Sequence, residues 1–262
     1  MNMRFWFLAF CLSILLIPAV SSAQPVDTRG IRIVDGEIVM GKPVLQRYLR
    51  DWERITPRHE KIYREVVDKM YANEDMIIGS ASEARYYYAK SYDYTPFSKE
   101  IIDRLTLHAF TADTSEDLAE VNDALFKYRD LLKKHLANYD VLKFAFSMAR
   151  IDTKYGSPSF LNKVKKALEA DIRRGNNDGS APFKAYQVIT FGEENYLLRR
   201  HGGVVQDSEI YQVGPKFFNV HNLIGKDGRE KMVYFDISQP LIGSYLRRKI
   251  QEREDSLRIP GQ

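Results

Sequence analysis

Cysteine is almost absent from this chain of 262 residues, since Cys11 is the only one. It lies in an apolar run, Phe5 to Val20, between a short basic start and the small residues 21–23. This layout predicts a secretory signal peptide over residues 1–23, cleaved near Ala23. An uncleaved N-terminal anchor is the alternative, although about sixteen apolar residues are short for a membrane span, which needs ~20. The mature chain, periplasmic or secreted, would contain no cysteine, which excludes disulfides and thiolate chemistry.

An excess of charge of one sign is also lacking. The 39 basic and 35 acidic residues leave a net charge of +4, which becomes +3 (4 − 1) once Arg4 leaves with the signal peptide. The two signs are interspersed along the chain, a pattern typical of a solvated surface. Nucleic acid is therefore not an expected partner. No segment after residue 23 is apolar enough to span a bilayer.

The familiar motifs of catalysis and cofactor binding are missing. The sequence contains no His-Glu-x-x-His, Gly-x-Ser-x-Gly or Ser-x-x-Lys, and no glycine-rich phosphate loop. We therefore predict no catalytic residue, no metal ligand and no cofactor. Among the scattered histidines, His135 is expected in the last turn of a helix, where the dipole favours a cation. His201 is expected to end a strand, and His221 to face solvent.

The spacing of apolar residues changes along the chain from a helical period to a period of two, which predicts an α+β protein. A tight Asp35-Gly36 turn predicts a hairpin within residues 24–41. Residues 42–175 have helical spacing and are expected to form a helical domain. The glycine- and asparagine-rich stretch 174–182 then leads to residues 176–238, where a period of two predicts a small antiparallel β domain. A helix and tail, residues 239–262, close the chain.

Particular residues mark the expected ends of helices and strands. Four helix-start signals are read from capping residues and from prolines at the first helical position: Thr56-Pro57, Thr95-Pro96, Asp113 with Glu116, and Ser157-Pro158. One helix is expected over Asp140–Ile151, and Gly175 is expected to end the last one. The expected strands are Phe183–Thr190, Tyr196–His201, Glu209–Val213, Phe217–Ile224 and Lys231–Ser238.

Five of the sixteen tyrosines stand in "ARYYYAKSYDY", residues 84–94. On a helix from Ile77 to Tyr92, one face would carry an apolar stripe: Ile77, Ala81, Ala84, Tyr88 and Tyr92. Most of the cluster is thus expected to be core. Tyr86 would point to the opposite side, which makes it the one candidate binding residue, because aromatic anchors are favoured in contact surfaces.

Several stretches resemble known families. "ALFKYRDLLKKHLANYDVLKFAFSMARI", residues 124–151, resembles the packing of a degenerate tetratricopeptide unit. That stretch, "RYYYAKSYDYTPF" (85–97), "NDGSAPFKAYQVITFGEENYLLRRHG" (177–202) and "VYFDIS" (233–238) together resemble an exported bacterial family known as domain of unknown function 4919. The resemblance implies export and this architecture. It implies no activity.

Two hypotheses on function follow. The first is a non-enzymatic module of the bacterial envelope that binds a protein or peptide, because tetratricopeptide helices usually hold partners. The alternative is an envelope hydrolase whose carboxylates assemble only in the fold, with Asp178, Glu194 and Asp236 as the first to consider. For Asp178 the simpler role is turn formation in the Asn177–Ser180 loop. Asp236 is expected to face outward if Val233, Phe235 and Ile237 face the core.

Overall fold

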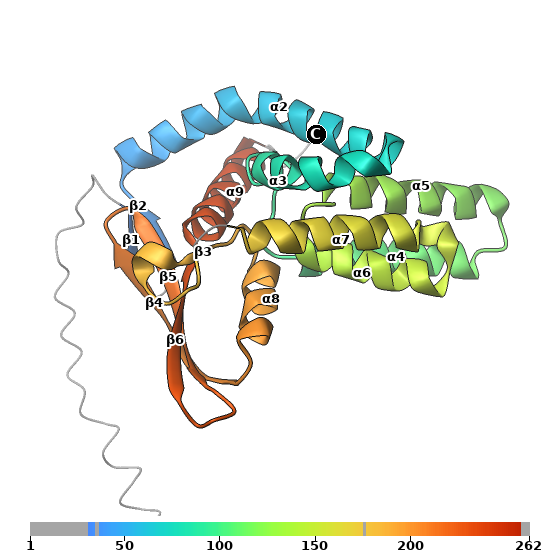
Figure 1. The fold of residues 1–262 in the computed structure, drawn as a ribbon. Helices are drawn as coiled ribbons and strands as arrows, with labels where there is room; N and C mark the ends of the chain where they lie inside the picture. Colours follow the sequence, from blue (N-terminus) through green and yellow to red (C-terminus); the bar gives the residue numbers. More distant parts are fainter. Residues whose placement is uncertain (1–30, 35–36, 175–176, 258–262) are drawn as a thin grey trace, which may run out of the picture.

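The computed structural model describes residues 31–34, 37–174 and 177–257, and it confirms the α+β class (Figure 1). The predicted signal peptide, the Asp35-Gly36 turn, Gly175 and the end of the tail lie outside these residues. Helices α4 to α7 gather at one end of the molecule, the sheet lies at the other, and α2 arches over the top. Among the described residues, none of the helices combines the length and the apolar composition that a membrane span requires.

The predicted N-terminal hairpin is confirmed. Strand β1 (Ile31–Val34) pairs antiparallel with β2 (Glu37–Met40), and Ile31 lies opposite Met40.

Helix α2 (Lys42–Ala72) corrects the first predicted helix start, because Pro57 lies inside it. A proline in a helix interior costs about 3 kcal/mol, since it lacks the N–H that would bond the carbonyl of residue 53. Here Pro57 is on the exposed side of the arched helix. Packing on both sides of the proline outweighs this cost: Leu45 and Tyr48 before it, and Tyr63, Val66, Val67 and Met70 after it.

The tyrosine cluster is mostly core, as predicted. Helix α3 (Ile77–Tyr88), which follows the short helix η1 (Glu74–Met76), has a buried stripe: Ile77, Ala81, Ala84 and Tyr88. The helix ends four residues before the predicted Tyr92, so Tyr92 leaves the stripe and is half-exposed beside Trp52. Tyr94 is buried, and its hydroxyl donates to the Ile189 carbonyl at 2.5 Å.

Four further helices build the helical core: α4 (Lys99–Thr114), α5 (Leu118–Lys134), α6 (Tyr139–Ile151) and α7 (Pro158–Ile172). The predicted start at Ser157 is confirmed, because its side chain accepts from the Phe160 N–H. The predicted capping box is wrong. Asp113 belongs to α4, and α5 is capped by Asp117, whose carboxylate accepts from the Ala119 N–H at 2.8 Å. Helix α4 starts three residues after the predicted proline.

Beyond residue 177 the chain forms a mixed sheet with strand order β3-β6-β5-β4. The predicted antiparallel strands are confirmed as β5 (Lys216–Ile224) and β6 (Glu230–Asp236), and β4 (Val204–Val213) contains the predicted Glu209–Val213 but starts five residues earlier. The first predicted strand is reduced to a short helix η3 (Pro182–Lys184) and to β3 (Tyr186–Gln187). Strand β3 runs parallel to β6, so the sheet is not purely antiparallel. Helix α9 (Ser238–Leu257) confirms the predicted C-terminal helix.

The predicted strand Tyr196–His201 is wrong, because these residues belong to helix α8 (Phe191–His201). The Thr190 hydroxyl caps this helix by accepting from the Glu193 N–H. Acidic residues occupy its first turn, and basic residues its last: Arg199, Arg200 and His201. This distribution of charge complements the helix dipole. Together with the Thr190 cap, it stabilises a helix where a weak period-two pattern had predicted a strand.

The helices and the sheet share their interior. Tyr139 of α6 and Ile172 of α7 pack in the core cluster of the sheet. The two ends of the described chain also meet, because Met40 of β2 and Tyr245 of α9 are buried together. The predicted boundary between domains 42–175 and 176–238 stays a prediction.

Candidate functional site at the junction of helices and sheet

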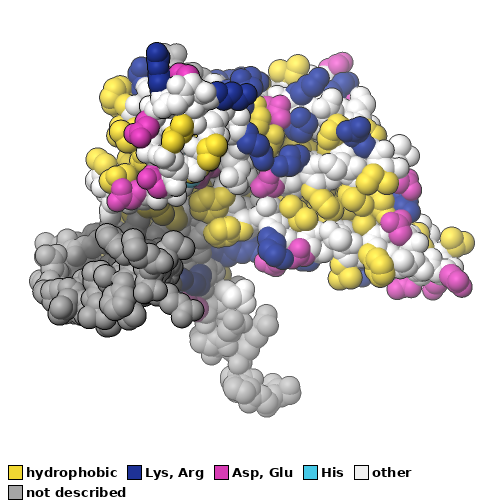
Figure 2. Space-filling model, turned by 90° about the horizontal axis from the view of Figure 1, so that it is seen from below, with side chains coloured by type: hydrophobic (Ala, Val, Ile, Leu, Met, Phe, Trp, Pro, Cys, Tyr) yellow, Lys and Arg dark blue, Asp and Glu magenta, His cyan; other side chains and the backbone are white. Residues whose placement is uncertain are grey.

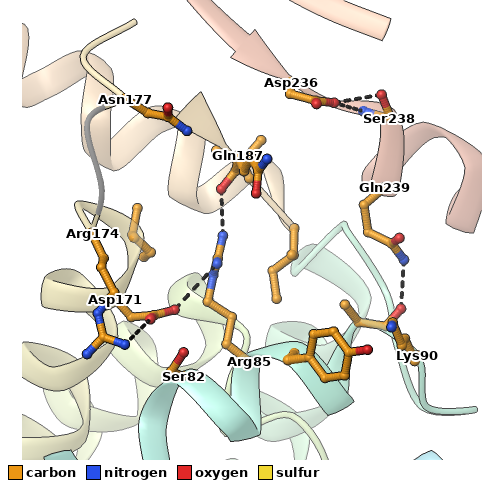
Figure 3. Close-up of a pocket in the computed structure, with 15 residues that line it drawn as sticks. Ser82, Arg85, Lys90, Asp171, Arg174, Asn177, Gln187, Asp236, Ser238 and Gln239 are labelled. Carbon is orange, nitrogen blue, oxygen red and sulfur yellow. Dashed lines mark hydrogen bonds and ion pairs between the residues drawn. The ribbon is translucent and has the colours of Figure 1, made fainter. Parts of the chain in front are cut away.

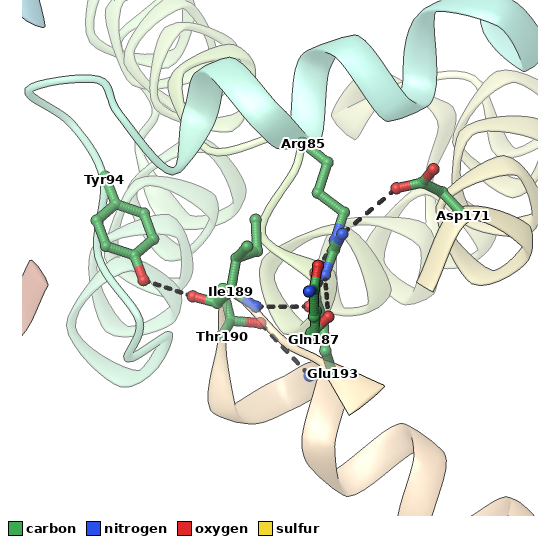
Figure 4. A network of polar contacts seen from close by, with 7 residues as sticks. All are labelled: Arg85, Tyr94, Asp171, Gln187, Ile189, Thr190 and Glu193. Atoms are coloured by element: carbon green, nitrogen blue, oxygen red, sulfur yellow. Dashed lines mark hydrogen bonds and ion pairs between the residues drawn. The ribbon is translucent and has the colours of Figure 1, made fainter. Parts of the chain in front are cut away.

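Arg85 joins the helical layer to the segment that precedes α8 (Figure 4). Its guanidinium donates two bonds of 2.8 Å to the Glu193 carboxylate and one of 2.7 Å to the Gln187 carbonyl. Asp171 at the end of α7 accepts a longer bond of 3.4 Å. The side chain of Glu193 is only 1% exposed and that of Arg85 14%. Burial lowers the pKa of Arg85, but Glu193 and Asp171 more than offset this and raise it above its ordinary value.

The same carboxylate fixes the backbone beside it. A Glu193 oxygen accepts from the Ile189 N–H at 2.8 Å, while the Ile189 carbonyl accepts from the Tyr94 hydroxyl. Both Glu193 oxygens therefore accept from Arg85, and Oε2 also accepts from a backbone N–H. These bonds make Arg85 and Glu193 a structural clamp, because they tie α3 to the segment before α8.

A cavity of about 490 Å³ opens next to this clamp (Figure 3). Ser82, Arg85 and Lys90 border it from α3 and its end, opposite Gln187 and Gln239. Its walls are mixed, because other parts of the lining are polar, charged and aromatic: Tyr86, Asp171, Arg174, Asn177, Asp236 and Ser238.

Tyr86, the candidate binding residue, lies on the wall of this cavity and is 54% exposed. The ammonium group of Lys90 lies 3.7 Å from the centroid of its ring, which is a cation–π contact. No carboxylate among the described residues lies within 4.0 Å of the Lys90 ammonium. The pair thus presents an aromatic surface and a positive charge that no described carboxylate pairs with.

A smaller cavity of about 240 Å³ lies between α2, α9 and the end of α3. Its lining is largely aromatic and apolar, and includes Tyr48, Trp52, Ile242 and Leu246. Both cavities are lined by Ala89, Lys90 and Gln239, and the Gln239 side chain donates to the Ala89 carbonyl at 2.7 Å. We call the two cavities together the junction groove.

His59 adds a polar group to the smaller cavity. Its Nδ1 atom is buried and has no hydrogen-bond partner among the described residues. Burial, followed by the charges of Lys90 and Arg58, lowers its pKa below the ordinary value. This favours the neutral imidazole, in which one ring nitrogen is a donor and the other an acceptor.

The three carboxylates considered for hydrolysis have separate partners. Asp178 accepts from the Ser180 N–H and hydroxyl, which is the turn-forming role, and these bonds lower its pKa. Asp236 lies on the face opposite Val233 and Phe235, as predicted, but its side chain is only 12% exposed, and it binds Lys216 at 3.0 Å and the Ser238 hydroxyl at 2.6 Å. Of the three, only Asp236 lines the junction groove.

Glu194, the third, forms a buried cluster that the sequence did not indicate. One of its oxygens lies 2.5 Å from both Asn219 Nδ2 and His221 Nε2. The prediction that His221 faces solvent is wrong, since it is 8% exposed. Helix α8 covers one face of β5, while Phe218 and Val220 are buried on the other. With both faces of the strand covered, alternation cannot separate inside from outside.

The other histidine predictions also need correction. His135 does follow the last turn of α5, but it is buried and bonds the Tyr88 hydroxyl through Nδ1 at 3.0 Å. Burial, aided by Arg247 and other cations, lowers its pKa to about 3, so it carries no charge at the helix end. His201 ends helix α8, where its Nδ1 lies 2.9 Å from Lys231.

Within the described ranges, no three His, Cys, Asp or Glu side chains gather closely enough to hold a metal ion. Charged side chains of both signs lie among hydrophobic ones on the visible face (Figure 2). A comparison with protein-family models, curated proteins and solved structures finds no match to this chain.

Proposed function

We propose that this protein is a non-catalytic interaction module that binds an extended peptide segment of a partner protein in the junction groove. The observation that carries the proposal is the Tyr86–Lys90 pair, which lies where two neighbouring cavities of different character meet. Cavities with apolar walls and a few well-placed polar groups are the usual binding sites of proteins.

The groove favours a particular peptide chemistry. Trp52, Ile242 and Leu246 supply apolar surface for one bulky side chain in the smaller cavity. The Lys90 ammonium can form an ion pair with an acidic side chain of a peptide that lies beside Tyr86. The peptide should therefore combine an aliphatic or aromatic residue with a nearby aspartate or glutamate. The carboxylates considered for hydrolysis give less support to an enzyme, because each is held by separate partners.

We further propose that the protein acts after export to the periplasm or the medium. This rests on the N-terminal sequence, with its basic start, apolar run and small residues before position 24. Intact-mass measurement of the protein recovered outside the cytoplasm tests it: a chain that begins at Gln24 supports the proposal, and an uncut chain kept in the cytoplasm contradicts it.

Peptide binding can be followed with Trp52, because the only other tryptophan is Trp6 in the predicted signal peptide. The probe is an array of acetylated octapeptides that place leucine, phenylalanine or serine two to four residues from glutamate, glutamine or lysine. Hits are titrated against a chain that starts at Gln24. We expect peptides with both a large apolar residue and glutamate to bind and to shift the Trp52 emission.

Two variants with matched controls test the site. Lys90→Gln and Tyr86→Ala should each weaken binding about fivefold, since one exposed contact contributes roughly 1 kcal/mol. The controls are Lys99→Gln and Phe126→Ala, which change an exposed lysine and an exposed aromatic residue that do not line the groove. If the groove variants bind as tightly as these controls, or if the array shows no preference, the proposal is wrong.

A further inference from the structure

Strand β4 is an edge strand of the four-stranded sheet. It pairs with β5 on one side and is last in the strand order. No second described strand pairs with it, although the Gln212 side chain near its end donates to the Ile31 carbonyl of β1 at 2.6 Å. All ten of its residues are exposed, among them five large apolar ones: Val204, Val205, Ile210, Tyr211 and Val213.

Proteins usually protect such an edge, because its free N–H and C=O groups are a template for another strand. Short length, lysine and proline are the common protections. Strand β4 contains neither lysine nor proline, and it is longer than the average strand of about 5–6 residues. The protections present within the strand are one irregularity between Val205 and Asp207 and two charged side chains, Asp207 and Glu209.

The charges of β4 lie on one face. Asp207 pairs with Asn222, Glu209 with Val220 and Tyr211 with Phe218, so these three β4 side chains alternate along the same side of the sheet. Neither acid forms an ion pair with a described residue, and the Glu209 carboxylate accepts only from the Tyr211 hydroxyl, at 2.5 Å. Ile210, 44% exposed, points to the opposite side.

This pattern disfavours a second copy of the chain as the occupant. An antiparallel pair of β4 strands centred on Ser208 would set Asp207 directly against Glu209 of the other copy, twice. Like charges in that position destabilise a sheet. That pairing brings four carboxylates together, and β4 contains no basic side chain to offset them.

We propose that β4 binds an extended, basic segment of a partner protein as an added antiparallel strand. Lysine or arginine at alternate positions would lie opposite Asp207 and Glu209. A β-branched residue would lie opposite Ile210. Backbone hydrogen bonds supply binding in this mode, and the alternating side chains supply selectivity. This surface is separate from the junction groove, which selects acidic peptides.

The probe is the labelled peptide Ac-Ser-Thr-Val-Lys-Thr-Lys-Val-Ser-NH₂, measured by fluorescence anisotropy with the chain from Gln24. A second peptide has glutamate in place of both lysines. We expect the basic peptide to bind at least tenfold more tightly than the acidic one. In Asp207→Lys/Glu209→Lys the preference should invert, a gain of binding that a misfolded variant cannot show. Lys90→Gln should leave the basic peptide's affinity unchanged.

The backbone bonds are tested on the unchanged protein. Two further peptides carry N-methyl groups on alternate residues, one set on each edge of the peptide strand. We expect one of them to lose binding and the other to keep it. Equal binding by both N-methylated peptides, equal binding by the basic and acidic peptides, or concentration-dependent dimers that Asp207→Lys/Glu209→Lys alters would each overturn the proposal.

Discussion

Replacement of Arg85 by methionine should destabilise the protein strongly. The change keeps a long side chain at a position that is 14% exposed, but it removes both 2.8 Å bonds to Glu193 and the bond to the Gln187 carbonyl. Glu193, 1% exposed, would then keep only its bond from the Ile189 N–H. Removing one partner of a buried ion pair costs about 3–5 kcal/mol, because the remaining charge stays buried without compensation.

A double-mutant cycle separates this effect from the loss of packing. Glu193→Gln in the Arg85→Met background removes the stranded charge and keeps an oxygen that can accept from Ile189. We therefore expect the double variant to lose less stability than Arg85→Met alone, with a coupling of at least about 2 kcal/mol. The assay is urea unfolding followed by circular dichroism and Trp52 fluorescence. The control is Arg104→Met on the exposed side of α4, expected to change the free energy of unfolding by less than about 0.5 kcal/mol.

Either of two results would refute the reasoning. A loss below about 1 kcal/mol for Arg85→Met would show that the clamp contributes little. A coupling near zero would show that Arg85 acts through packing alone, independently of Glu193.

Two further predictions concern a histidine and two glycines. His135 has a pKa of about 3 in the fold against about 6.5 in the unfolded chain. The unfolded chain therefore takes up a proton that the folded one does not, and stability falls as pH drops from 6.5 toward 3, by up to about 1.4 kcal/mol per pH unit. Between pH 7 and 5 the wild type should thus lose about 2 kcal/mol more than His135→Gln, and parallel pH profiles would contradict this. Gly243→Ala should destabilise by about 1–3 kcal/mol, because its methyl group would overlap the Tyr94 ring; Gly79→Ala in α3, which meets no atom within 4 Å, should be neutral or stabilising in the same thermal melts.

The secondary structure was predicted best for elements that bury only one face. Helix α7 illustrates this, because the serine cap and the proline start predicted from Ser157-Pro158 were both confirmed. Pro57 shows the limit of such signals, since the same residue pair that starts a helix elsewhere lies inside α2. Its cost is local, while the contacts that outweigh it come from α9 and from the main core.

The candidate site was largely beyond reach of the sequence. Tyr86 could be singled out, because helical spacing places it opposite the buried stripe. Its neighbours in the junction groove could not, since Gln239 meets Ala89 across 150 positions of the chain. Arg85 and Glu193 are likewise 108 positions apart. No periodicity links residues at that separation. Two acids at the start of a helix would have been a local hint, but Tyr196–His201 of α8 were predicted as a strand, so this helix start was not recognised.

The burial of Met40 against Tyr245 has a consequence for the order of events during synthesis. A ribosome releases residue 40 long before residue 245, so the first hairpin must wait for its partner through most of translation. Contacts between such distant positions close late and slow the search for the native state. Shortened chains that end before α9 should therefore stay bound to chaperones, however well α4 to α7 have already formed.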